Sequence, residues 1–399
     1  MILRIPIGAF LNSRETVEAV EALKEDRLLF RSTIDVHEGG ILAAVSYLAD
    51  KQTPKLLIVE TSSQDDRIFE ELEGLANVCD PETRVILIGN QNDIGLFRTL
   101  IQAGISDYLI TPLGDDVLRD SIAKVFEGVD SDTSGRVIAF AGMTGGAGSS
   151  VIAQNVAHEL AVAYDEQAIL VDLDLSYGTA ALTYNMQPRQ TIVDALSQTD
   201  HLDAGLLNQF FMDFGESKLS VLASPSSLSI GMDITPDSLD LLLRVLKSMA
   251  EFIVLDVPHV WEPWVNDVIA GADELILICR PNLTNLRNAK NVVEYLGPKR
   301  GVDYPTRVVL NQVGAAKRAD LKDKDFKDAL ALEPSLSIPY DPEAFGRALN
   351  IGEMMSKASP KSKATAAIID LAKLVSAREA SAEEGKKKGF SMFKKGAKK

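Results

Sequence analysis

A glycine-rich turn and three aspartates are the residues of this chain whose types and spacing could do chemistry. The turn lies within Arg136–Ser150, RVIAFAGMTGGAGSS, where an apolar run leads into glycines and then into a helical pattern. Backbone N–H groups of such a turn, with the positive end of the next helix, bind phosphate-like anions. Asp172, Asp174 and Asp256 each end or closely follow an apolar run. Carboxylates beside an anion cradle need a cation to offset their repulsion, so the pattern predicts a Mg²⁺–nucleotide site.

Each candidate residue has an expected role in that site. The phosphates would be bound by Gly145, Gly146, Ala147, Gly148, Ser149 and Ser150. The Ser150 hydroxyl stands where such loops place a Mg²⁺ ligand, and Asp172 and Asp256 would complete the metal site. Asp174 would position the attacking water if hydrolysis occurs. Asn311, at the end of the apolar run VVLN, and Pro339 in SIPYDPEAFG would form a base pocket, so the expected cofactors are ATP and Mg²⁺.

The lysine that completes the loop pattern G-x-x-x-x-G-K-[ST] is absent. Ser149 occupies its position, and Thr144 precedes the glycine pair. Losing a charge aimed at the transition state lowers a rate by orders of magnitude, so we expect binding with slow or absent hydrolysis. Two alternatives remain: a turn that binds nothing, and a dinucleotide site, although the glycine spacing does not match G-x-G-x-x-G. The aspartates could equally be loop acids or, for Asp256, a helix cap.

Composition narrows the class of protein. The 399 residues are 46% hydrophobic and 25% charged, which is typical of a globular chain with two domains. The two cysteines stand in unrelated contexts, and no signal peptide or membrane-length apolar run is evident, so a cytoplasmic location is expected. A net charge of −16 argues against nucleic acid as a partner.

Strand and helix patterns alternate along most of the chain, which predicts an α/β fold with two doubly wound parallel sheets. We expect domains at 1–128 and 136–377, a linker at 129–135, and an acidic tether with a lysine-rich tail at 378–399. The strands expected in the first domain are Arg4–Phe10, Leu28–Ser32, Lys55–Glu60, Arg84–Gly89 and Asp107–Ile110. Those expected in the second are Val137–Ala141, Ala168–Asp172, Lys218–Ala223, Phe252–Asp256, Glu274–Cys279 and Thr306–Leu310.

The first domain resembles the receiver domain of response regulators in its strand–helix order and in the run LITPLGDDVLRDSI. The resemblance implies a flavodoxin-type strand order. The phosphorylation residues are missing, because Glu60, Ile7–Gly8, Gly89 and Thr111 stand at their positions. We therefore expect an interaction module without phosphotransfer. Glu60 would be an ordinary solvated carboxylate or, alternatively, a mimic of a phosphorylated state.

The second domain resembles the ParA/MinD family of dimeric ATPases. The family loop K-G-G-x-G-K-[ST] stands here as Thr144–Ser150 with both lysines replaced. More narrowly, LDVPHVWEPWVNDVI, TNLRNAKNVVEYL and SIPYDPEAFGRALNIGEM resemble the CpaE/TadZ proteins of Flp (tight adherence) pilus systems. That resemblance implies an ATP-binding homodimer that marks a cell pole or the inner membrane and assembles pilus secretion components. An active ATPase that cycles on the membrane, and a scaffold without nucleotide, are the alternatives.

Two further segments have open interpretations. Lys386–Lys399 places Phe390, Met392 and Phe393 among lysines, a composition that could bind an anionic membrane surface. A solvated tail and a docking strip for an acidic protein partner are the alternatives. Trp261 and Trp264, shortly after Asp256, would form a partner or dimer contact, or pack within the domain.

Overall fold

The computed structural model divides the chain into two units, Met1–Ser131 and Asp132–Lys399. The described residues are 5–26, 28–29, 32–51, 53–63, 66–81, 83–114, 116–126, 135–198, 202–227, 234–300 and 304–376. The predicted tether and lysine-rich tail, and most of the predicted linker, lie outside the described residues. No helix in the described ranges is both long and apolar enough to cross a membrane.

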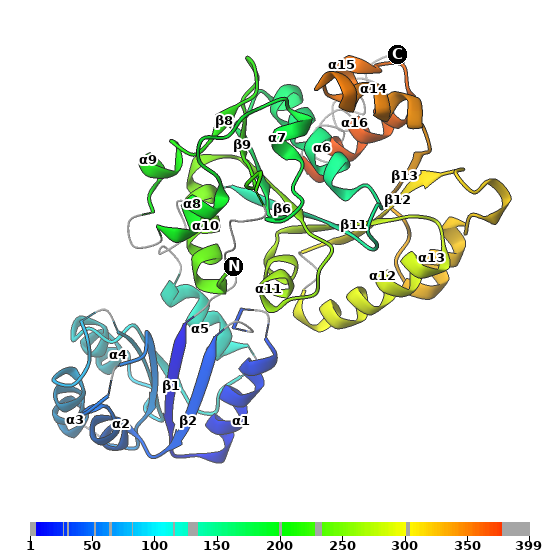
Figure 1. The fold of residues 1–399 in the computed structure, drawn as a ribbon. Helices are drawn as coiled ribbons and strands as arrows, with labels where there is room; N and C mark the ends of the chain where they lie inside the picture. Colours follow the sequence, from blue (N-terminus) through cyan, green and yellow to red (C-terminus); the bar gives the residue numbers. More distant parts are fainter. Residues whose placement is uncertain are drawn as a thin grey trace, which may run out of the picture. The chain divides into compact units, whose positions relative to one another are not determined.

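The first unit contains a five-stranded parallel sheet in the order β2-β1-β3-β4-β5, which is the predicted flavodoxin-type order (Figure 1). Its strands are β1 Pro6–Leu11, β2 Thr33–Glu38, β3 Leu56–Glu60, β4 Arg84–Gly89 and β5 Asp107–Ile110. Its helices are α1 Arg14–Ala22, η1 Leu23–Glu25, α2 Ile41–Leu48, α3 Asp66–Ala76, α4 Ile94–Gln102 and α5 Val117–Phe126.

Both faces of this sheet are covered by helices. Leu56 and Ile58 of β3 belong to one apolar cluster with residues of α1 and α5, whereas Leu57 and Val59 belong to a second cluster with residues of α2, α3 and α4. Side chains alternate between the faces of a strand, so a strand buried on both faces must be a continuous apolar run. This is why β3 could be recognised in the sequence.

The prediction of a strand at Leu28–Ser32 is wrong. Leu28 and Leu29 lie in a turn and pack into the cluster beneath the sheet, and the second strand begins only at Thr33. β2 is the outermost strand, so its side chains are only partly buried and its sequence, TIDVHE, carries polar residues. The apolar run therefore marked core packing next to the strand, not the strand itself.

The second unit contains an eight-stranded sheet in the order β13-β12-β11-β6-β10-β7-β9-β8, parallel except for β8 (Figure 1). Its strands are β6 Arg136–Gly142, β7 Ala168–Asp172, β8 Met212–Asp213, β9 Leu219–Leu222, β10 Phe252–Val257, β11 Glu274–Cys279, β12 Thr306–Val313 and β13 Leu336–Pro339. Six of these were predicted to within a few residues; β8 and β13 were not. The two parallel-sheet units confirm the predicted fold class.

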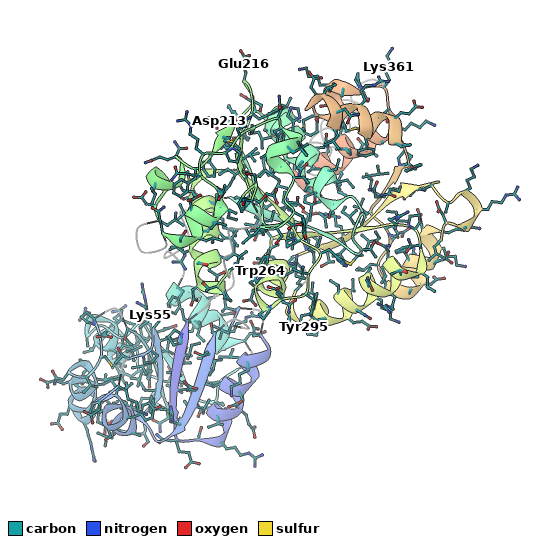
Figure 2. The ribbon with its side chains drawn as sticks, viewed as in Figure 1. Lys55, Asp213, Glu216, Trp264, Tyr295 and Lys361 are labelled. Atoms are coloured by element: carbon teal, nitrogen blue, oxygen red, sulfur yellow. The ribbon has the colours of Figure 1, made fainter. Side chains whose placement is uncertain are left out.

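Helices again cover both faces of the second sheet. They are α6 Ser149–Tyr164, α7 Ala180–Thr183, α8 Ile192–Ser197, α9 Ala204–Leu207, α10 Pro236–Met249, α11 Pro263–Gly271, α12 Leu283–Leu296, η3 Gly297–Lys299, η4 Lys317–Ala319, α13 Asp323–Leu330, α14 Pro342–Ile351, α15 Met355–Ala358 and α16 Lys363–Ser376. Ile138 and Phe140 of β6 pack with α6 and α16. Ala141 faces the other side, toward α11 and α12, which carry Trp264 and Tyr295 (Figure 2).

Candidate nucleotide site

The glycine-rich turn joins the carboxyl end of β6 to α6, in the middle of the second sheet. Gly146 and Gly148 have left-handed φ angles of +73° and +92°, a region that residues with a side chain rarely adopt. Gly148 is the N-cap of α6 and makes no side-chain cap, so the first N–H groups of the helix need another partner. A Cβ on Gly145 or Gly146 would meet no atom within 4 Å, so the space over the turn is open to a ligand.

Carbonyl oxygens of the turn accept hydrogen bonds from amide and imidazole side chains outside the turn. The donors are His259 Nδ1 to Gly142 O (2.8 Å), Asn288 Nδ2 to Met143 O (2.7 Å), Gln312 Nε2 to Gly146 O (3.0 Å) and Asn311 Nδ2 to Ala147 O (2.8 Å). The donors come from the loop after β10, from α12 and from β12. Because these carbonyls are bound to the protein, they do not turn toward an anion placed on the loop.

Asp172 and Asp256 lie side by side at the carboxyl ends of β7 and β10, where they are register partners. Both are buried. Asp172 Oδ2 accepts from the Ala180 N–H (3.0 Å) and the Ser224 hydroxyl (3.2 Å), and its Oδ1 accepts from the Asp174 N–H (3.2 Å). Asp256 Oδ2 has no hydrogen-bond partner among the described residues. The pair thus presents an unsatisfied carboxylate oxygen beneath the glycine turn.

Burial raises the pKa values of both carboxyls. For Asp172 burial outweighs the hydrogen bonds that favour ionisation, and its pKa rises to about 6. For Asp256 burial is again the largest cause, the charge of Asp172 adds to it, and the pKa lies well above the ordinary value. A divalent cation between these groups would remove the repulsion and let both ionise.

The residues present fit a Mg²⁺ ion whose ligands are shared with a bound nucleotide. A hydrogen bond from Ser150 lowers the pKa of Asp256, so the predicted hydroxyl and carboxylate lie together. In the part of the chain that the structure describes, no cluster of three or more His, Cys, Asp or Glu side chains could hold a metal alone. Mg²⁺ commonly keeps waters and takes one or two carboxylates plus substrate phosphates, which matches this donor set.

Asp174 lies close to the pair but its carboxylate is occupied by the following turn. Its Oδ1 accepts from the N–H groups of Ser176 (3.3 Å) and Tyr177 (2.9 Å). The side chain is half-buried. Its assignment to a water-positioning role stays a prediction.

The predicted base-binding residues line one cavity of about 230 Å³ next to the end of the glycine turn. It is lined by Gly148, Val151, Asn311, Gln312, Pro339, Tyr340, Asp341, Pro342 and Phe345. One expectation is corrected: β12 does not end at Asn311 but continues to Val313, across a register shift against β13. Asn311 Nδ2 supports the turn, and its buried Oδ1 has no partner among the described residues. Only that oxygen remains to accept from a base.

Two residues that contact Asp172 were missed by sequence reasoning, as were the turn-supporting side chains of His259, Asn288 and Gln312. A Cβ on Gly178 would lie 2.5 Å from Asp172 Oδ2 and 1.9 Å from Ser224 Oγ, so this position must be glycine. Gly178 has a weak signal, since it follows closely on the Asp172–Asp174 run. Ser224 has none, because it reaches Asp172 only through the pairing of β7 with β9.

Glu60, expected to be an ordinary solvated carboxylate, is buried at the end of β3. Its Oε2 accepts from the N–H groups of Asn12 (2.7 Å) and Ser13 (3.0 Å), and the Thr16 hydroxyl lies 2.6 Å away. Burial acts to raise the pKa of Glu60, but these hydrogen bonds outweigh it and hold the pKa below its usual value. The carboxylate is therefore a fixed anion at the start of α1, because one of its oxygens accepts from two N–H groups of the loop before the helix and from a hydroxyl in its first turn.

Comparisons with known proteins agree with the α/β fold of the second unit. No family model matches the chain. The chain is 22% identical over 246 residues to the septum site-determining protein MinD of Bacillus subtilis, covering 60% of this chain and 89% of that protein. It is 25% identical over 265 residues to an uncharacterized ATP-binding protein of Methanocaldococcus jannaschii, covering 65% and 95%.

Two solved structures extend the comparison. A ParA family ATPase from Chlorobium tepidum is 25% identical with a TM-score of 0.55, covering 59% of this chain and 98% of that one. A pilus assembly protein CpaE from Caulobacter crescentus is 40% identical but covers only 30% of this chain, 98% of that one, with a TM-score of 0.29.

Fold and site together define an α/β unit whose parallel strands end at a glycine-rich turn and a buried acidic pair. Within that class, the chain is similar in sequence and fold to MinD/ParA-family ATPases.

Proposed function

We propose that this protein is an ATP-binding localisation and assembly factor of a Flp/Tad-type pilus secretion system. Mg-ATP binds at the glycine turn and promotes a homodimer, and hydrolysis is slow or absent. The protein works at the inner membrane or a cell pole, as a peripheral protein of the cytoplasm. The receiver-like unit contacts other pilus components, and no specific nucleic acid is bound.

One observation supports the nucleotide part of the proposal most directly. The site contains buried side-chain oxygens without a hydrogen-bond partner among the described residues, and its turn contains no lysine. Asp256 Oδ2 and Asn311 Oδ1 lack partners among the described residues, and these side chains lie near Ser150 and near Ala147, where a metal and a base would bind. Buried polar atoms are costly to leave unpaired, so a ligand that satisfies both is favoured. Ser149, in place of lysine, leaves the terminal phosphates without a neutralising side chain.

The pilus part rests on the sequence runs that resemble CpaE/TadZ proteins. Two of these runs include residues of the candidate site. LDVPHVWEPWVNDVI leads from Asp256 through α11, and SIPYDPEAFGRALNIGEM supplies a wall of the base cavity through Pro339 and Tyr340. An active ATPase cycling on a membrane remains the second candidate, because Arg280 follows the end of β11 beside the turn and would supply replacement charge.

Binding and turnover of Mg-ATP on one pure sample test this proposal. We expect calorimetry to show saturable binding and phosphate release to stay near the buffer background. Ser150→Ala combined with Asp256→Ala should abolish binding, because a hydroxyl and a carboxylate on the metal are both lost. Ser197→Ala, an exposed serine of α8, is the matched control and should bind as the parent does.

The outcomes separate the candidates. Tight binding without release supports a nucleotide-clamped assembly factor, whereas steady release would identify a working ATPase. An affinity unchanged by the double substitution would show that the nucleotide does not bind at this turn. Absence of any Mg-ATP binding to the parent protein would leave a scaffold without nucleotide.

A further inference from the structure

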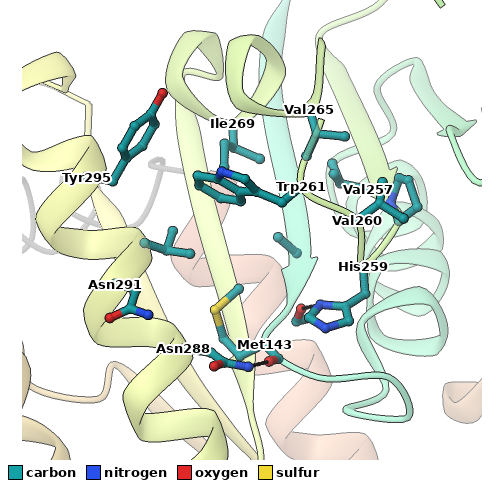
Figure 3. A pocket seen from close by; sticks show the side chains of 14 residues that line it. Met143, Val257, His259, Val260, Trp261, Val265, Ile269, Asn288, Asn291 and Tyr295 are labelled. Atoms are coloured by element: carbon teal, nitrogen blue, oxygen red, sulfur yellow. Dashed lines mark hydrogen bonds between the residues drawn. The ribbon is translucent and has the colours of Figure 1, made fainter. Parts of the chain in front are cut away.

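A second cavity, of about 460 Å³, lies on the other side of the glycine turn from the base cavity. Its walls are the end of β6, the loop after β10, α11 and α12. Trp261 and Tyr295 reach toward each other across its mouth, with ring centroids 5.2 Å apart in an edge-to-face arrangement (Figure 3). Val265 and Ile269 of α11 line it from within. The cavity is thus an apolar pocket with two aromatic rings at its opening.

The sequence did not decide whether Trp261 and Trp264 contact a partner or pack within the domain, and the structure shows that they differ in exposure. Trp264 is only 8% exposed, and its Nε1 donates to Glu262, so it is a packing residue. Trp261 is 54% exposed, although its ring already contacts Tyr295. A half-exposed tryptophan at the rim of an apolar cavity is the composition of a binding site for apolar side chains.

The cavity shares its floor with the nucleotide site. Gly142 and Met143, which open the glycine turn, line it, and their carbonyls accept from His259 Nδ1 and Asn288 Nδ2 (Figure 3). Both donor residues also line the cavity. An occupant would therefore contact the same side chains that hold the turn in place.

The chain itself contains one segment of matching chemistry outside the described residues. Phe390–Phe393, FSMF, puts three large apolar side chains within four residues, flanked by lysines. Two phenylalanines and a methionine are the side chains that an aromatic-rimmed apolar pocket accommodates.

The chain that follows Ser376, the last described residue, is long enough to bring Phe390 to the cavity. Arg136 Nη1, at the start of β6, donates to Val375 O (2.8 Å), so α16 ends beside the amino end of β6, while the cavity lies at the carboxyl end. Seven residues of strand span about 20 Å. The fourteen residues from Ser376 to Phe390 extend at most about 50 Å, and as a flexible coil average about 20 Å. The segment can therefore reach the cavity round the edge of the sheet.

Charge favours the same contact. The last fifteen residues carry seven lysines and no acid, and the net charge of the whole chain is −16, which leaves −23 on residues 1–384. The rim itself has both signs, because Glu262 and Glu294 adjoin the two aromatic residues and the Lys299 Nζ lies 3.7 Å from the Tyr295 ring centroid. The attraction is thus between the tail and the acidic protein as a whole, and the apolar cavity fixes where the segment binds.

We propose that Phe390–Phe393 binds in cis to the cavity between α11 and α12. The bound tail lies against the second unit and must dissociate from the cavity before it can contact a membrane. The proposal does not require a pilus role or ATP hydrolysis. At the effective concentration of about 1 mM that a short tether gives, a free-peptide Kd of about 0.1 mM or tighter would fill about nine-tenths or more of the cavities.

Fluorescence quenching of the full-length protein tests this. The chain has two tryptophans, Trp264 is buried, and Trp261 lies on the rim, so acrylamide quenching reports mainly on Trp261. Replacing both aromatic residues, Phe390→Ser with Phe393→Ser, should raise the quenching constant at least about twofold, because the rim becomes free. Lys398→Ser with Lys399→Ser is the matched control, since it changes the tail and keeps the apolar segment; its quenching constant should equal that of the parent.

Two further observations make the result specific. In a Trp261→Phe background the aromatic substitutions should no longer change quenching, and in the parent the effect should not depend on protein concentration. Equal quenching with and without the two phenylalanines would overturn the proposal. So would a concentration-dependent effect, since the segment would then bind a second copy.

Discussion

In the absence of Mg²⁺ and nucleotide, the second unit should lose stability as the pH rises, and Asp172→Asn should remove part of that loss. Burial raises the pKa of Asp172 from 3.8 to about 6 in the folded protein. Below both values the carboxyl is protonated in the folded and the unfolded state. Between them only the unfolded state ionises, so the free energy of unfolding falls with rising pH, and above the folded pKa the loss is complete.

The magnitude follows from the size of the shift. A difference of about two pKa units corresponds to about 3 kcal/mol. About half of this is already lost at pH 5, so Asp172 should account for about 1.5 kcal/mol between pH 5 and pH 8. Asp256, whose pKa is raised further by burial and by Asp172, adds to the loss in the same direction.

Urea unfolding in EDTA, followed by tryptophan fluorescence, measures this. Both tryptophans, Trp261 and Trp264, belong to the second unit, so the signal reports on that unit. Asp172→Asn also alters contacts with the Ala180 N–H and Ser224, but that cost is the same at every pH. The variant should therefore gain about 1.5 kcal/mol on the parent between pH 5 and pH 8. A difference that stays constant over this range would refute the assignment of the shift to Asp172.

Two other substitutions test the buried carboxylate of Glu60 in the first unit and the replacement of the loop lysine by Ser149 in the second. Glu60→Gln should lower the free energy of unfolding of the first unit by about 2 kcal/mol, since hydrogen bonds to a charged acceptor are lost. Hydrogen exchange at the Asn12 and Ser13 amides should accelerate. Glu38→Gln on the edge strand is the control and should change neither the stability nor these exchange rates. Ser149→Lys should lower the Kd for Mg-ATP about tenfold or more by adding a charge-assisted contact; an unchanged Kd in calorimetry would show that this position does not face the phosphates.

Much of the fold was predictable because parallel strands buried on both faces are continuous apolar runs. The bounds predicted for Arg84–Gly89, Ala168–Asp172 and Glu274–Cys279 are those of β4, β7 and β11. β2 and β8 were misplaced or missed because they are edge strands, and an edge strand needs little apolar sequence. Their positions depend on neighbours distant in the sequence.

The predicted site residues lie around one turn, but the hydrogen bonds that they make could not be predicted from the sequence. Asn311 was expected to face a base; instead its Nδ2 supports the Ala147 carbonyl, and only Oδ1 stays open. Glu60 was expected in solvent because a glutamate at a strand end is normally exposed, yet it accepts from three donors that follow β1, in the loop before α1 and in the first turn of α1. Such contacts depend on which loop folds over a residue, and no local pattern records that.

The amide and imidazole side chains that hold the turn carbonyls have a consequence for how nucleotide binding depends on salt concentration. The side-chain donors are amides and an imidazole, His259, Asn288, Asn311 and Gln312, whose work is to orient peptide dipoles. An anion bound by oriented dipoles and a chelated metal within a partly buried site is screened by salt much less than one bound by a flexible exposed lysine. Nucleotide affinity in this protein should therefore stay nearly constant over a range of salt concentrations that would weaken a lysine-dependent loop.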